Sequence, residues 1–242
     1  MTNTLHERLV TTTPIIALDV PTAPAALSLV TELGDACRFY KVGNELFTAA
    51  GPSVVAAIRE QGSEVFLDLK FHDIPNTVAG GVRNAAKLGA SLVTVHASGG
   101  SAMLRAAADA ARDAGGNCRV LAVTVLTSLS AEAVAGAWGR SPNLDVRSEV
   151  LRLADLAAEA GAHGVVCGGG EARALSERFG DRLSILVPGV RAAGGATQDQ
   201  ARVVTPHEAS EAGARYIVVG RMVTAALDRR QAMQAVNREL GF

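Results

Sequence analysis

Eight short apolar segments recur along the chain, and each is followed by a stretch with helical character. Several are almost continuously apolar rather than alternating, which is typical of parallel strands buried on both faces. The stretches between them, such as residues 22–34, 103–115 and 146–161, are rich in alanine and end in glycine, the usual residue after a helix. The expected strands cover residues 14–20, 37–43, 64–70, 91–97, 119–126, 163–169, 184–190 and 215–221.

Eight strand–helix units in 242 residues predict a (β/α)8 TIM barrel that forms a single domain over residues 1–242. A doubly wound open sheet is the alternative, although such a sheet seldom needs eight units of this regularity. Residues 127–145 form the longest interruption and contain the single tryptophan, Trp138. We expect this segment to form an extra helix or a lid.

Composition excludes several classes of partner. The net charge is −1, so the chain lacks the basic field that would hold nucleic acid or an acidic membrane surface. Its three cysteines, Cys37, Cys118 and Cys167, match neither a disulfide framework nor a zinc site, which favours the reducing cytoplasm. The first apolar run is too short for a signal peptide, and no later run approaches the length of a membrane span.

Charged residues cluster at the end of the third expected strand, in the sequence FLDLKFHDIPNT. Side chains two residues apart on a strand face the same side, so Asp68 and Lys70 are expected to point together into the barrel mouth. Lys41 lies on the neighbouring strand, and Asp73 follows just past the strand end. The expected arrangement is an alternating row in the order Lys41, Asp68, Lys70, Asp73. A buried ion-pair network that merely closes the barrel top is the structural alternative, although such pairs often stabilise little.

Polar residues also follow other expected strands, at the end of the barrel where enzymes of this fold carry their chemistry. The loops after the seventh and eighth strands often hold a phosphate, and here they contain Arg191 with Gln200, and Gly220 with Arg221. An arginine can contact a phosphate through two hydrogen bonds. These residues predict a phosphate site, with a flexible, solvated polar loop as the alternative.

The long FLDLKFHDIPNT signature closely resembles that of the orotidine 5′-phosphate decarboxylase family. Further segments match the other conserved blocks of that family in order, so the resemblance covers nearly the whole chain. One departure is Gly168, where members often carry serine after the cysteine. The further segments are IALDV, YKVG, TVHASGG, VTVLTS, PGVR and VVGR.

The resemblance implies a catalytic role for the charge row. It makes Lys70 the proton donor, with Lys41, Asp68 and Asp73 completing its network. It also implies a homodimer with shared active sites, in which Asp73 and Thr77 reach into the partner's site. The implied reaction converts orotidine monophosphate to uridine monophosphate in pyrimidine biosynthesis, with neither a metal nor another cofactor.

The resemblance assigns the remaining residues to substrate binding. Asp19 and Lys41 would hold the ribose hydroxyls, and Thr127 and Ser128 would meet the pyrimidine edge. The phosphate would be held by Gln200, Gly220 and Arg221, with Arg191 in or beside that loop.

Two rival functions remain open. A related magnesium-dependent sugar-phosphate lyase shares the shorter Asp-x-Lys-x-x-Asp core, but the longer signature and the PGVR loop argue against it. A catalytically silent barrel that binds a nucleotide is the second, and the complete set of charged residues argues against that. His72 and His96 are expected to shape the turn and pack at the strand end, and Cys167 to lie in the core.

Overall fold

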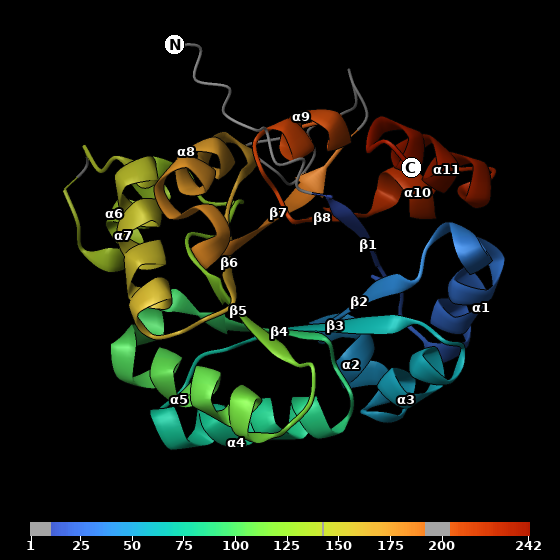
Figure 1. Ribbon diagram of the computed structural model, residues 1–242, viewed down its shortest axis with the longest axis horizontal. Helices are drawn as coiled ribbons and strands as arrows, with labels where there is room; N and C mark the ends of the chain where they lie inside the picture. Colours follow the sequence, from blue (N-terminus) through green and yellow to red (C-terminus); the bar gives the residue numbers. More distant parts are fainter. Residues whose placement is uncertain (1–10, 142, 192–203) are drawn as a thin grey trace, which may run out of the picture.

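Eight parallel strands close into a barrel in sequence order, and β8 pairs with β1 (Figure 1). This computed structural model describes residues 11–141, 143–191 and 204–242. The closed barrel confirms the predicted (β/α)8 fold and excludes the open sheet. Each of the eight expected segments overlaps one strand. The strands are β1 (Thr13–Ala17), β2 (Phe39–Gly43), β3 (Glu64–Phe71), β4 (Leu92–His96), β5 (Arg119–Val123), β6 (Gly164–Val166), β7 (Ser184–Val190) and β8 (Tyr216–Val219).

Helices surround the ring of strands (Figure 1). The expected helix at residues 22–34 is α1, whose first turn is capped by the Thr22 side chain and whose last residue is followed by Gly34. The helices are α1 (Ala23–Leu33), α2 (Asn44–Ala50), α3 (Ser53–Glu60), α4 (Pro75–Lys87), α5 (Gly100–Asp113), α6 (Ala131–Trp138), α7 (Val146–Glu159), α8 (Gly169–Phe179), α9 (Pro206–Glu211), α10 (Arg221–Thr224) and α11 (Arg229–Glu239). Three short 3₁₀ turns complete the described elements: Gly34–Ala36, Ala97–Gly99 and Gly180–Arg182.

Two apolar clusters bury the two faces of the sheet. On β1, Ile15 and Ala17 point into the barrel, whereas Ile16 and, just past the strand, Leu18 pack outward in the cluster that includes the helices. Successive strand residues alternate between the two faces, and here both faces are apolar. This double burial explains why the strand segments are almost continuously apolar in the sequence.

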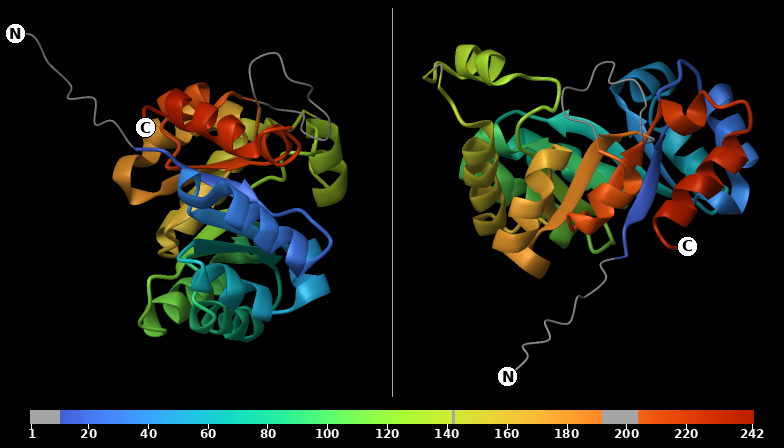
Figure 2. Two further views of the ribbon diagram at one scale, coloured as in Figure 1. Left: turned by 90° about the vertical axis from the view of Figure 1, so that its right-hand side faces the viewer. Right: turned by 90° about the horizontal axis from the view of Figure 1, so that it is seen from above.

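The interruption after β5 contains the expected extra helix. The helix α6 begins after Ser130, whose side chain accepts a hydrogen bond from the Ala133 backbone N–H. Figure 2 shows α6 in yellow-green, standing away from the barrel. Trp138, the last residue of α6, is partly buried against the outer core, which is the apolar cluster between the strands and the helices. A role as a lid stays a prediction.

The three cysteines are all buried. Burial raises the pKa of both the Cys37 and the Cys118 thiol to about 11, so both stay protonated and unreactive near neutral pH. Cys167 is fully buried in the outer core, as expected.

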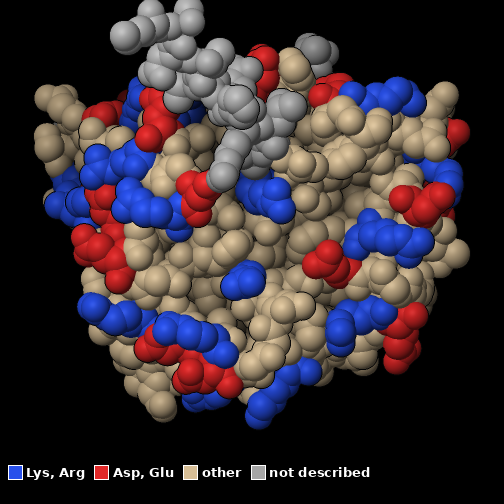
Figure 3. All heavy atoms as spheres, viewed as in Figure 1, with Lys and Arg blue, Asp and Glu red and all other residues tan. Residues whose placement is uncertain are grey.

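Acidic and basic side chains are interspersed on the face of the molecule shown in Figure 3. This distribution fits the nearly balanced charge of the sequence. Across the described ranges, every helix is too short or too polar to cross a membrane.

Candidate active site

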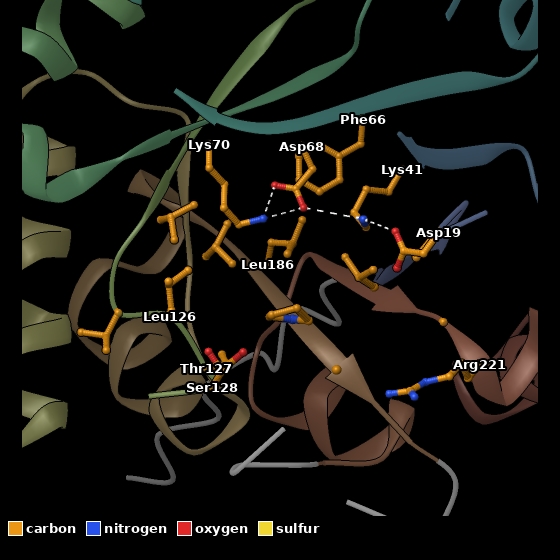
Figure 4. A pocket seen from close by; sticks show the side chains of 18 of the residues that line it. Asp19, Lys41, Phe66, Asp68, Lys70, Leu126, Thr127, Ser128, Leu186 and Arg221 are labelled. Atoms are coloured by element: carbon orange, nitrogen blue, oxygen red, sulfur yellow. Dashed lines mark hydrogen bonds and ion pairs between the residues drawn. The ribbon is translucent and has the colours of Figure 1, made fainter. Parts of the chain in front are cut away.

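A cavity of about 370 Å³ lies at the carboxyl-terminal ends of the strands. One side carries charged residues from β2, β3 and the segment after β1, and the opposite side carries polar residues from the segments after β5, β7 and β8 (Figure 4). The barrel therefore brings together side chains that are up to about 200 residues apart in sequence. The predicted site residues that line it are Asp19, Lys41, Asp68, Lys70, Thr127, Ser128, Arg191, Gly220 and Arg221.

Four alternating charges form a row along one side of this cavity (Figure 4). The Lys70 Nζ atom lies 2.8 Å from both Asp68 carboxylate oxygens. The Lys41 Nζ atom lies 3.8 Å from Asp68 Oδ2 and 2.9 Å from Asp19 Oδ1. The Asp68 and Lys41 side chains are only 12% and 11% exposed, so water screens this part of the row weakly. The row is therefore a preorganised set of charges facing the cavity.

Lys70 has an unusual backbone conformation. Its φ is +51°, and among the described residues it is the only non-glycine residue with positive φ. The pairing between β3 and β4 shifts register here: Leu67 pairs with Val93, but Phe71 pairs with Val95. The prediction that Asp68 and Lys70 point together is confirmed, but an irregular strand achieves it. Strained backbone of this kind often occurs at functional sites.

Asp73 does not join the row within its own chain, which corrects the expected order. The strand β3 ends at Phe71, and the chain then turns away towards Pro75, the first residue of α4. Asp73 is exposed, and its carboxylate accepts a hydrogen bond from the Ile74 backbone N–H at 2.6 Å. Asp19 is the fourth member of the row instead. Thr77 is also exposed, and neither residue lines the cavity of its own chain.

The opposite side of the cavity carries the expected phosphate residues. Gly220 precedes α10, and Arg221 is its first residue. Because α10 is a single turn of four residues, its dipole is small, and the guanidinium group is the stronger feature for an anion. Arg191 follows β7 directly and also lines the cavity. Gln200 lies outside the described residues.

Sequence reasoning missed Thr94 and the apolar floor. Thr94, in the middle of β4, is fully buried and contacts both Asp68 and Lys70. The feature of the sequence that could have pointed to Thr94 is a threonine at an inward-facing position of a mostly apolar strand. The floor is formed by Phe66, Leu186 and Val218, which belong to the inner core and also line the cavity.

The two histidines lie beside the charge row. Their rings pack 5.3 Å apart between centroids, and His96 is the last residue of β4, as expected. Burial lowers the pKa of His96, and the neighbouring His72 and Lys70 lower it further. His96 is therefore neutral near pH 7, and it is not among the described residues that line the cavity.

A closed (β/α)8 barrel with a charged cavity at the ends of its strands defines a barrel enzyme with a small-molecule site. The model of the orotidine 5′-phosphate decarboxylase / HUMPS family matches residues 12–236. The chain therefore belongs to this family, as the resemblance in its sequence indicated.

Individual relatives agree with the family match. The orotidine 5′-phosphate decarboxylase of Moorella thermoacetica is 48% identical over 231 residues, which cover 93% of this chain and 91% of that protein. The protein of the same name from Halorhodospira halophila is 49% identical over 226 residues, with 93% and 94% covered. The crystal structure of orotidine 5′-phosphate decarboxylase from Lactobacillus acidophilus has a TM-score of 0.84 at 39% identity, with 96% of this chain and 100% of that chain covered.

Proposed function

We propose that this enzyme decarboxylates orotidine 5′-phosphate to uridine 5′-phosphate, with neither a metal nor another cofactor. The observation that carries the proposal is the Lys70–Asp68 pair, which faces a cavity of about 370 Å³. The names of the similar proteins from Moorella thermoacetica and Halorhodospira halophila support the choice of substrate.

The reaction breaks the bond between ring carbon six and the carboxylate, and the bonding electron pair stays on the ring. The resulting carbanion has no carbonyl placed to accept its charge as an ordinary enolate, so the site must stabilise it electrostatically. An ammonium group about 3 Å from that carbon contributes roughly 5 kcal/mol at an effective dielectric constant of about 20. Lys70 then transfers a proton to the carbon, and solvent returns a proton to the amine.

The rest of the row prepares Lys70 for this step. Asp68 holds the ammonium through both carboxylate oxygens, and Lys41 lies on the other side of Asp68. These charges are oriented before substrate binds, so they need little reorganisation during the reaction. The apolar floor favours neutral carbon dioxide over the carboxylate from which it forms.

Binding groups surround the row at positions that suit a nucleotide. Asp19 and Lys41 contact the ribose hydroxyls, and Thr127 and Ser128 meet the pyrimidine edge. Binding energy from the remote phosphate organises the reacting groups and so raises kcat as well as affinity. The phosphate is held by Arg191, Gln200, Gly220 and Arg221.

The proposed form of the enzyme is a cytoplasmic homodimer with shared active sites. Asp73 and Thr77 are exposed on their own chain and would complete the partner's site. Ile74 between them has 67% of its surface exposed, and a subunit contact at this point would cover it.

Turnover of orotidine monophosphate tests the function directly. Loss of substrate absorbance should proceed at the same rate with and without a metal chelator. A lack of turnover under both conditions would refute the proposed function. Strict dependence on magnesium would instead favour the sugar-phosphate lyase, since the matching family model also includes the HUMPS branch. Nucleotide binding without turnover would favour a silent barrel.

A further inference from the structure

The Thr94 hydroxyl binds the backbone of Lys70 directly. It is linked to the Lys70 ammonium group indirectly, through Asp68. Its hydroxyl oxygen accepts a hydrogen bond from the Lys70 backbone N–H at 2.9 Å. The same hydroxyl donates to Asp68 Oδ1, also at 2.9 Å. A carboxylate oxygen only accepts, so the single hydroxyl proton points to Asp68 and a lone pair remains for Lys70. Because Asp68 in turn binds Lys70 Nζ, the three residues form a closed hydrogen-bonded ring.

The position of Thr94 coincides with the irregularity in β3. Between the pairs Leu67–Val93 and Phe71–Val95, three residues of β3 stand opposite Thr94 alone. Lys70 has its positive φ within this bulge, and its backbone N–H bonds to the Thr94 side chain. The threonine hydroxyl therefore supports a backbone conformation that lysine rarely adopts.

Thr94 lies behind the charge row and is fully buried. It is not among the described residues that line the cavity, so it acts through its two neighbours. We propose that Thr94 is a positioning residue, which holds the Lys70 backbone and the Asp68 carboxylate in the geometry that aims the ammonium at the reacting carbon. This inference rests on the proposed function for the identity of the reaction.

The kinetic test compares Thr94→Val, which keeps the side-chain shape, with Thr94→Ser, which keeps the hydroxyl. Misplacement of a reacting group by about 1 Å can cost about 10²-fold in rate, so Thr94→Val should lower kcat by about that factor. KM should change little, since Thr94 does not line the cavity. Thr94→Ser should recover most of the lost kcat.

Thr124→Val is the matched control. Thr124 is also a buried threonine next to a strand of the barrel, but its hydroxyl donates to the Val166 backbone carbonyl at 2.7 Å. This variant should lose stability as Thr94→Val does and keep the wild-type kcat. A wild-type kcat in Thr94→Val, or a serine variant as slow as the valine variant, would overturn the proposal.

A second readout does not depend on turnover. The chain has only three lysines, Lys41, Lys70 and Lys87, so their ammonium signals can be assigned by NMR after lysine labelling. In Thr94→Val the Lys70 signal should shift and exchange faster with water, while that of the distant Lys87 stays unchanged. An unchanged Lys70 signal would refute the positioning role. If Thr94→Val changes the Lys70 signal but the wild-type protein does not turn over orotidine monophosphate, the positioning role is supported and the proposed reaction is refuted.

Discussion

The Lys70 Nζ atom is held equally by the two oxygens of Asp68, at 2.8 Å from each. The Lys70 side chain is 31% exposed towards the cavity, whereas that of Asp68 is only 12% exposed. The carboxylate therefore anchors the pair in the barrel, and the ammonium remains accessible to a substrate.

Replacement of Lys70 by alanine should abolish most of the activity without unfolding the barrel. The change removes both the proton donor and the positive charge, so kcat/KM should fall by at least about 10³-fold. Circular dichroism and calorimetric titration with uridine monophosphate should show a folded protein that still binds nucleotide. Lys87→Ala, which changes an exposed lysine at the end of α4, is the control and should keep full activity. Substantial activity in Lys70→Ala would contradict its role as proton donor.

Mixing two inactive variants tests the shared active site. If Asp73 serves the partner's site, Lys70→Ala and Asp73→Ala should each be inactive as homodimers. After the subunits exchange, each heterodimer contains one site with both residues intact, so activity should return to about a quarter of the wild-type value per subunit for a two-fold dimer. No recovery, with subunit exchange shown by mass spectrometry, would mean that Asp73 does not act in trans. Sedimentation of the wild type establishes the dimer itself.

Two glycine-to-alanine changes should affect stability in opposite directions. A Cβ atom on Gly164, the first residue of β6, would lie 2.1 Å from the Ser184 carbonyl oxygen of β7. Gly164→Ala should therefore separate these strands and cost at least about 2 kcal/mol. Gly136 lies inside α6, where a Cβ atom would meet nothing within 4 Å. Gly136→Ala should stabilise the protein by about 0.5 kcal/mol. Urea unfolding measures both changes, and equal effects of the two variants would contradict the strand contact.

Ionisation of His163 should make stability depend on pH. Burial lowers the pKa of His163, and the positive charges of Arg119 and Arg215 lower it further. Its folded pKa lies below the unfolded value, so between these two values the unfolded chain binds more protons. Stability is therefore greatest above about pH 6.5, falls as the pH drops towards the folded pKa, and then levels off.

Removal of one arginine tests this cause. Arg119→Gln should raise the pKa of His163, measured by NMR titration of the imidazole, and should reduce the loss of stability in acid. Arg105→Gln, an exposed change on α5, should leave this pKa unchanged. An unaltered pKa of His163 in Arg119→Gln would show that the charge of Arg119 does not contribute to the shift.

The sequence by itself determined the barrel and most residues of its candidate site. Strand and helix signals are local, since they depend on apolar runs and caps such as Thr22 before α1. The rule that chemistry gathers at strand ends then selected Lys41, Asp68, Lys70 and Arg221, all of which line the cavity. That prediction needed only the order of the strands.

Only the tertiary structure decided how these residues meet. It placed Asp19 rather than Asp73 in the row of one chain, because β3 ends at Phe71 and the chain then turns away. It also placed Thr94 opposite the irregular part of β3 and gave Lys70 its positive φ. These features depend on the register between two strands that lie more than twenty residues apart in the chain. An irregularity of this kind arises where two strands pair, so the residue pattern of either strand read alone does not show it.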